Sequence, residues 1–254
     1  MAAGTADNGA AVKTASRTLD VIEAFVRRGM PLSLTELARE IGAPISTCHG
    51  VVRTLQGRGY LMVLDRKRAL YPTRRLQQVA LGVARHDPIV ARLRPVLAAL
   101  RDRTDETVVL ARREGDEVVY LDVLESSQTI RYAPLPGDRK PIHSSSLGKA
   151  LLSAGGRADF DAFLSRRPLL AVTPNTITDG ARLWADIEAA RGRGYFVSRA
   201  ENVPEVMGVS VLLPVGDELL ALALSGPIAR YQTHFDFNLG ELMKTVATIC
   251  DATA

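Results

Sequence analysis

Residues 32–61 read LSLTELAREIGAPISTCHGVVRTLQGRGYL, and this stretch decides the fold of the N-terminal third of the chain. Ser33 is followed three positions later by Glu36, which is the spacing of a capping box at the start of a helix. Apolar residues at helical spacing predict one helix over about 34–41 and, after a short connector, a second over about 45–56. Two short helices joined by a tight turn are the core of a helix-turn-helix motif.

The flanking sequence extends this motif. Residues 14–28 are apolar at helical spacing and predict a helix ahead of the other two. Residues 60–64 and 69–71 read as two strands joined by a basic turn that contains Arg66, Lys67 and Arg68. Three helices followed by a hairpin predict a winged helix-turn-helix, which places its third helix in the major groove of DNA and its hairpin, the wing, on the phosphate backbone.

Charge is divided unevenly along the 254 residues. Residues 1–85 hold 13 Lys and Arg against 6 Asp and Glu, whereas residues 86–254 hold 19 against 22, and the whole chain carries +4. A basic third joined to a mildly acidic remainder indicates an anionic partner for one end only, and double-stranded DNA at the winged domain fits that partner.

Composition excludes several classes of protein. Charge-free stretches such as 219–229 are too short to span a membrane, and the N-terminus resembles neither a secretory signal nor a transit peptide. Cys48 and Cys250 lie at opposite ends of the chain and form neither a disulfide framework nor a metal-ligand pair. We therefore expect a cytoplasmic protein with no cofactor, no metal and no membrane partner.

Four segments are predicted along the chain: a disordered tail over 1–12, the winged helix-turn-helix over 13–73, a linker helix over 74–87 and a second domain over 88–254. The linker is predicted to end at Asp87-Pro88, because the residue before a proline disfavours helix. Its apolar stripe needs a partner, for which a second copy of the chain is the candidate.

The second domain mixes strands and helices, with a predicted hairpin turn at Gly115-Asp116. Strands are predicted over 108–111, 118–121, 129–132, 195–198, 206–215 and 219–224. Helices are predicted over 89–103, 146–153, 158–166, 180–191 and 234–253. Hairpins without strict βαβ alternation favour an α+β domain on an antiparallel sheet.

Three blocks resemble the IclR family of bacterial transcriptional regulators, in the family's order: LSLTELAREIG at 32–42, GDRKPIHSSSLGKALL at 137–152 and RGYFVSRAENVP at 193–204. The resemblance implies a winged helix-turn-helix joined by a linker helix to a GAF-like effector domain. It also implies a homodimer or a dimer of dimers that binds operator DNA under the control of a small-molecule effector. Repression is the expected sign of regulation, with activation as the alternative.

The chain departs from the family pattern at a few positions. Gly50 stands where members often have a basic residue, and the wing ends in Tyr-Pro-Thr-Arg at 71–74 instead of Tyr-Arg-Leu-Gly. Glu205 stands where many members have glycine. These departures bear on the operator sequence and on the rim of the effector pocket.

Polar and basic side chains of the winged domain are the candidate DNA contacts: Thr35, Ser46, Thr47, His49, Arg53, Arg66, Lys67 and Arg68. Two alternatives stay open at this point: the basic turn is only a solvated turn, and Ser46 is only a helix cap.

The resemblance places the effector site in the second domain, at Leu135, Ser145, Ser146, Leu147, Glu201, Asn202, Ser210, Ala223 and Ser225. Hydroxyls beside a helix N-terminus suit a carboxylic or aromatic acid. As alternatives, Ser145 and Ser146 are plain helix caps, and Glu201 binds a ligand hydroxyl or pairs with an arginine.

Two other functions are alternatives to a ligand-responsive regulator. A hydrolase using His143 and a nearby serine lacks a Gly-x-Ser-x-Gly elbow, and the four histidines have no metal-ligand spacing, so we expect no enzyme and a structural His143. A constitutive DNA-binding or oligomerisation protein, whose second domain binds nothing, is the other alternative.

Overall fold

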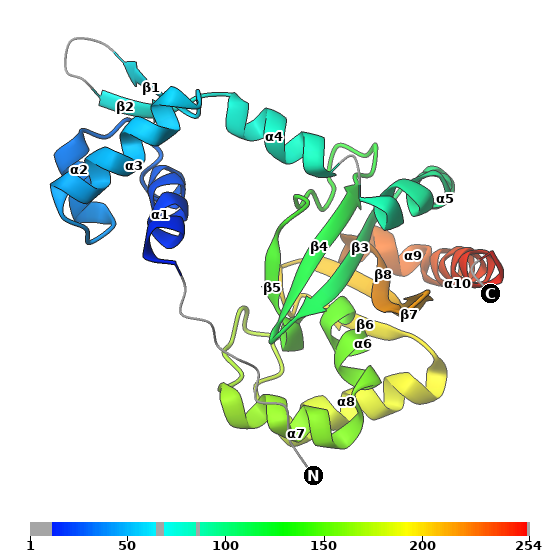
Figure 1. Ribbon diagram of the computed structural model, residues 1–254. Coiled ribbons are helices and arrows are strands. Elements are labelled where there is room, and N and C mark those ends of the chain that lie inside the picture. The colour runs from blue at the N-terminus through cyan, green and yellow to red at the C-terminus, as the bar shows by residue number, and fades with distance from the viewer. Residues whose placement is uncertain (1–11, 65–68, 85–86, 253–254) are drawn as a thin grey trace. The chain divides into compact units, whose positions relative to one another are not determined.

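The computed structural model describes residues 12–64, 69–84 and 87–252 (Figure 1). The chain divides into two compact units, Met1–Asp87 and Pro88–Ala254. Almost all of the predicted disordered tail, and the three basic residues predicted at the tip of the wing, lie outside the described residues.

The first unit has three helices followed by a two-stranded hairpin, as predicted. It comprises α1 (Lys13–Arg28), α2 (Leu34–Glu40), α3 (Ile45–Gly57), β1 (Leu61–Leu64), β2 (Ala69–Pro72) and α4 (Arg75–Ala84). The capping box at α2 forms, because Glu36 N–H donates to Ser33 Oγ at 3.3 Å and Ser33 N–H donates to Glu36 Oε2 at 2.8 Å. Leu32 pairs with Leu70 of β2, which ties the chain ahead of α2 to the hairpin.

The second unit is built on a six-stranded antiparallel sheet in the order β5-β4-β3-β8-β7-β6. Its strands are β3 (Thr107–Glu114), β4 (Glu117–Leu124), β5 (Arg139–Pro141), β6 (Phe196–Arg199), β7 (Val206–Val215) and β8 (Glu218–Pro227). Its helices are α5 (Pro88–Thr104), the 3-10 turn η1 (Ile142–Ser144), α6 (Ser146–Ala154), α7 (Gly156–Arg166), α8 (Gly180–Arg193), α9 (Ile228–Thr233) and α10 (Phe235–Asp251).

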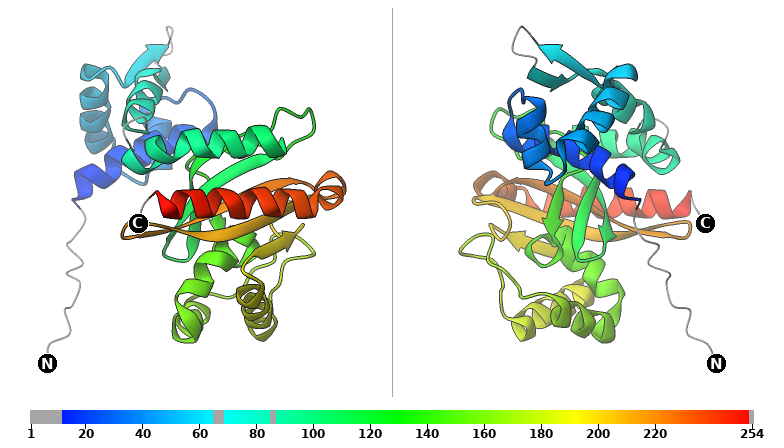
Figure 2. Two further views of the ribbon diagram at one scale, coloured as in Figure 1. Left: turned by 90° about the vertical axis from the view of Figure 1, so that its right-hand side faces the viewer. Right: turned by 60° about the vertical axis from the view of Figure 1, so that its left-hand side comes forward.

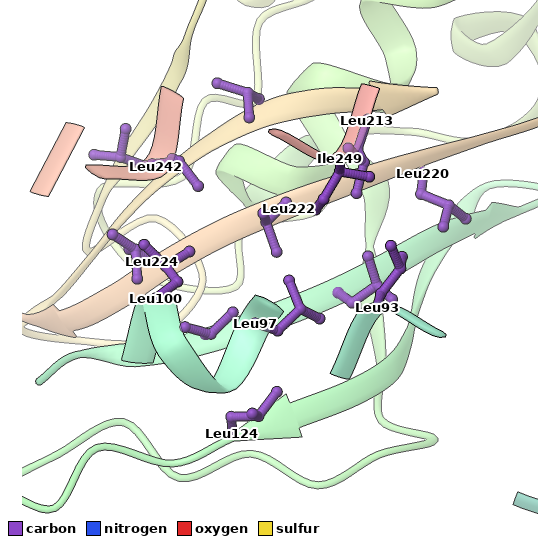
Figure 3. Close-up of a cluster of buried hydrophobic side chains, with 14 of the residues drawn as sticks. Leu93, Leu97, Leu100, Leu124, Leu213, Leu220, Leu222, Leu224, Leu242 and Ile249 are labelled. Carbon is purple, nitrogen blue, oxygen red and sulfur yellow. The ribbon is translucent and has the colours of Figure 1, made fainter. Parts of the chain in front are cut away.

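Helices cover both faces of this sheet. α5 and α10 pack side by side on one face, and α6, α7 and α8 lie on the other (Figure 2). On the first face, leucines such as Leu97 of α5, Leu222 of β8 and Leu242 of α10 form one buried cluster (Figure 3). The expected α+β class is confirmed: a helix-turn-helix unit followed by a unit on an antiparallel sheet.

One predicted element is wrong. Residues 129–132 form no strand, because two of their carbonyls accept hydrogen bonds from side chains: Thr107 Oγ1 donates to Tyr132 O at 2.5 Å and an Arg230 guanidinium N–H donates to Ile130 O at 2.8 Å. The strand beside β4 is instead β5. The closing helix predicted over 234–253 is confirmed as α10, and the short helix α9, which was not predicted, precedes it with His234 between the two.

Candidate DNA-binding face and ligand pocket

The exposed face of α3 is the candidate DNA-binding surface. Ser46, His49 and Arg53 lie on it at spacings of three and four residues, and all three are exposed. The opposite face of α3 is buried in the core of the first unit and consists of Cys48, Val51, Val52 and Leu55. The buried face holds the helix in place, so the exposed face is free for a partner.

The remaining candidates of the first unit have mixed surroundings. Thr35 is exposed on α2, and Thr47 is half-buried. Ser46 is not the helix cap, since the N-cap of α3 is Pro44 and it makes no side-chain capping bond. Gly50 lies on the exposed face beside His49, and a Cβ added there would meet no atom within 4 Å.

The second unit has a small pocket where α6 begins beside β4, β6, β7 and β8. Its volume is about 20 Å³, and its walls carry no charged side chain. The lining residues are Tyr120, Tyr132, Ser145, Ser146, Leu147, Ser198, Asn202, Val203, Val206, Gly208 and Ser225. A cavity of this size holds about one water molecule, so the structure shows the pocket closed.

Three serine hydroxyls converge at the floor of this pocket. A Cβ added at Gly208 would lie 2.9 Å from Ser146 Oγ, 3.2 Å from Ser225 Oγ and 3.3 Å from Ser198 Oγ. Glycine in the middle of a strand commonly marks such a close approach. On another wall the phenol oxygens of Tyr120 and Tyr132 are 3.3 Å apart, and burial raises the pKa of both groups. The pocket therefore presents neutral donors and acceptors.

Five of the nine residues proposed for the effector site line this pocket: Ser145, Ser146, Leu147, Asn202 and Ser225. Ser145 also caps α6, because Gly148 N–H donates to its Oγ at 3.1 Å, so the capping alternative holds for Ser145. Ser146 is not the cap, and its hydroxyl faces Gly208.

The other four proposed effector residues lie elsewhere. Leu135 is 65% exposed and outside the lining. Ser210 and Ala223 are fully buried neighbours in the β7–β8 register, next to the Gly208–Ser225 pair. Glu201 forms an ion pair with Lys149, not with an arginine, and lines a different pocket. In this closed form, none of the four can touch a ligand in the small pocket.

Sequence reasoning missed Tyr120, Tyr132, Ser198, Val203, Val206 and Gly208. Two of them carried a usable signal. Gly208 lies inside a predicted strand, where glycine is unfavourable unless another group approaches closely. Ser198 follows Phe196 on the same face of the predicted strand, so an inward hydroxyl could have been read from the alternation.

The loop between β6 and β7 is bounded by strained backbone. Ala200 and Glu205 adopt φ of 54° and 59°, a left-handed conformation that costs a non-glycine residue about 1 kcal/mol or more. This explains why glycine suits position 205. We expect Glu205→Gly to raise the free energy of unfolding by up to about 1 kcal/mol in urea titrations. Glu205→Ala, which removes the same carboxylate and keeps the strain, is the control; an equal gain in both variants would contradict the strain argument.

His143 is a structural residue. It is 4% exposed, and its Nε2 lies 2.9 Å from Leu170 O, to which the neutral ring can donate. Burial, aided by the charge of Lys149, lowers the pKa of His143.

The folded chain then binds fewer protons at His143 than the unfolded chain does. The contribution of His143 to the free energy of unfolding is therefore complete above its pKa in the unfolded chain, about 6.5, and is lost as the pH falls towards its lower pKa in the folded chain. Urea titrations between about pH 5 and pH 8 should show this loss, and His143→Gln should reduce it. His234→Gln changes an exposed histidine and should leave the loss unchanged; an unaltered profile in His143→Gln would contradict the assignment.

The described part of the chain has no helix long and apolar enough to cross a membrane. Among the same residues, no three His, Cys, Asp or Glu side chains are grouped to hold a metal ion.

Comparison with known proteins matches both units. The family model "IclR helix-turn-helix domain" covers residues 14–63, and "Bacterial transcriptional regulator IclR C-terminal" covers residues 81–251. The HTH-type transcriptional regulator BhcR of Paracoccus denitrificans is 31% identical over 229 residues, 89% of this chain and 81% of its own length. The transcriptional repressor AllR of Escherichia coli is 25% identical and covers 91% of this chain and 86% of its own.

Among solved structures, an IclR homologue from Microbacterium hydrocarbonoxydans in complex with 4-hydroxybenzoate superposes with a TM-score of 0.76. It is 25% identical, and the match covers 93% of this chain and 97% of that one. With both family models matched over most of the chain, this protein belongs to the IclR family of DNA-binding transcriptional regulators and is not an enzyme.

Proposed function

We propose that this regulator represses transcription from the cytoplasm by binding operator DNA through α3, and that a small carboxylic or aromatic acid in the serine-lined pocket changes its affinity for DNA. The observation that carries the proposal is the convergence of the Ser146, Ser198 and Ser225 hydroxyls on Gly208, in a pocket without charge. Hydroxyl and phenol donors suit the carboxylate and hydroxyl groups of such acids. The homologue bound to 4-hydroxybenzoate and the relative named as a repressor support the ligand class and the sign.

Ligand entry requires the pocket to open, because about 20 Å³ cannot hold an organic acid. The loop between β6 and β7 supplies Asn202 and Val203 to the wall, and the residues that bound it are strained. Ser210 lies two residues along β7 from Gly208, on the same face of the sheet, and its buried hydroxyl has no hydrogen-bond partner among the described residues. An opening towards Ser210 and Ala223 therefore adds one hydroxyl to the site.

A groove in the first unit supports a homodimer. A dimer of dimers would consist of two such homodimers. It lies between α1, β2 and α4, has a volume of about 590 Å³, and is lined mostly by apolar side chains such as Ile22, Phe25 and Leu76. Nearby, Val26 is 80% exposed. Apolar surfaces of this kind commonly mark protein interfaces, and a second copy would place two recognition helices on one operator.

A thermal-shift screen of the full chain against aromatic and carboxylic acids, beginning with 4-hydroxybenzoate, tests the ligand. A ligand that binds the folded state raises the melting temperature by mass action. The affinity for DNA from upstream of the regulator's own gene is then measured at increasing concentrations of each hit. If the hit changes the affinity for DNA, DNA must change the affinity for the hit by the same factor.

Gly208→Val is the matched variant, because its side chain would displace the three hydroxyls, the nearest of which lies 2.9 Å from a Cβ at this position. It should keep DNA binding and lose the response to a hit. A response retained in Gly208→Val, or the absence of any hit, would contradict the proposal, and the second result would favour a constitutive DNA-binding protein.

A further inference from the structure

A second pocket opens at the edge of the sheet in the second unit. Its volume is about 370 Å³, within the usual range for small-molecule sites, and its wall includes Asp186, Arg193, Tyr195, Arg199 and Glu201. The pocket lies along β6, which ends the strand order. Arg199 lines it, whereas the adjacent Ser198 lines the serine pocket, and alternate residues of a strand point to opposite sides. The two pockets are therefore distinct.

A buried ionic cluster forms the inner end of this second pocket. Lys149 is 1% exposed, and its Nζ lies 2.8 Å from Glu201 Oε1, 2.8 Å from Asp186 Oδ2 and 3.1 Å from Val197 O. Two carboxylates thus share one ammonium. Burial raises the pKa of Glu201, and the charge of Lys149 opposes that shift. With both carboxylates ionised, the cluster carries a net negative charge. The contact to Val197 O also covers the free edge of β6, which is a structural role for Lys149.

That structural role leaves two buried carboxylate oxygens, one on Glu201 and one on Asp186, without a hydrogen bond. Glu201 is 8% exposed; its Oε1 accepts from Lys149, but its Oε2 has no hydrogen-bond partner among the described residues. Asp186 Oδ2 is close to Lys149, yet it too lacks a well-directed hydrogen bond. A buried acceptor without a donor is costly, so a group that donates hydrogen bonds and carries positive charge is favoured at this end.

The outer end of the pocket has the opposite charge. Arg193 and Arg199 are exposed, and the structure gives neither of them an acidic partner within the described ranges. The guanidinium of Arg193 lies 5.0 Å from the ring centre of Tyr195, which holds it at the rim. A carboxylate is the natural partner for such a group.

We propose that this pocket is a second small-molecule site, distinct from the serine pocket, and that it binds a zwitterion of amino-acid type. The ammonium or guanidinium group of the ligand donates to Glu201 Oε2, and its carboxylate contacts Arg193 and Arg199. A dicarboxylate would place a negative charge against Glu201, and a simple amine would leave both arginines without a partner.

Isothermal titration of the full-length protein with γ-aminobutyrate and L-arginine tests the site. We expect saturable binding of at least one probe and much weaker binding of butylamine and butyrate, which each carry one charge. Glu201→Gln and, separately, the surface double variant Arg193→Gln with Arg199→Gln should each weaken binding by about tenfold or more. Glu205→Gln changes a neighbouring exposed carboxylate outside the pocket and should bind as the parent does.

Gly208→Val blocks the serine pocket only and should leave probe binding unchanged, which separates this site from the proposed effector site. The Arg193 and Arg199 variants keep the test valid if Glu201→Gln fails to fold, because both arginines are exposed. Absence of binding by both probes at millimolar concentration would overturn the proposal. So would binding that the arginine variants leave unchanged, or butylamine or butyrate binding as tightly as the zwitterions.

Discussion

Gly148→Ala is expected to destabilise the second unit by about 3 kcal/mol or more, a loss that threatens its folding. Gly148 lies in the first turn of α6, against η1, and a Cβ there would sit 1.7 Å from Ile142 O and 2.5 Å from Ile142 C. Both are backbone atoms, so no side chain can turn aside to make room. The start of α6 would have to move, and with it the Ser146 hydroxyl at the floor of the serine pocket.

Urea unfolding of the purified full-length variant, followed by circular dichroism, measures this loss. Gly192→Ala is the matched control, because Gly192 is also a helical glycine, in α8, and a Cβ added there meets no atom within 4 Å. In that control the free energy of unfolding should rise by about 0.5–1 kcal/mol, because alanine has a better helix propensity than glycine. Equal stabilities of the two variants would show that α6 tolerates the extra methyl group and that the close approach to Ile142 is not a constraint.

The double variant His49→Ala with Arg53→Ala is expected to lose about 100-fold or more in affinity for specific DNA. Both side chains are exposed on the face of α3 that the core leaves free, and a good contact to a base edge contributes about 1–3 kcal/mol of discrimination. Since Gly50 between them offers no side chain, we expect these two residues to provide much of the sequence-specific contact. The loss should be larger on the specific sequence than on unrelated DNA, because backbone contacts made elsewhere persist.

Fluorescence anisotropy with a labelled specific duplex and a scrambled duplex, at several salt concentrations, separates these effects. Arg92→Ala is the control: like Arg53→Ala it removes one arginine charge, but from an exposed position of α5 in the second unit, and it should leave the affinity for the specific duplex unchanged. Parent-like affinity in the double variant would remove α3 as the recognition helix. An equal loss on both duplexes would assign the two side chains to the phosphate backbone instead.

Local signals made the first unit predictable from its sequence. The capping box of Ser33 and Glu36 and the apolar face of α3 involve residues within one or two turns of each other. The strand predicted over 129–132 fails for the opposite reason, since Thr107 and Arg230, distant in the chain, take its carbonyls. No local pattern can report such bonds.

The serine pocket was predictable only in part for a similar reason. Ser145, Ser146 and Leu147 are contiguous, and the family resemblance marked them together. Ser198, Gly208 and Ser225 meet only through the pairing of β6, β7 and β8. The register of that pairing is set by tertiary structure and cannot be read from the local sequence. The resemblance places Glu201 in this pocket as well, but its ion-pair partner is Lys149 of α6, which no local pattern around Glu201 indicates.

The position of β3 in the sheet has a consequence for synthesis of the chain. β3 pairs on one side with β4, which follows it directly in the chain, and on the other side with β8. The residues of β8 that pair with β3, Leu220–Ser225, are synthesised more than 100 residues after β3. Until then one edge of β3 has no strand beside it, which favours association with other chains. The first unit, whose core comes from a short early segment, can fold while the second is still being made. Nascent chains of this regulator should therefore bind chaperones most strongly between the emergence of β3 and that of β8, and completion of the sheet should be the slow step.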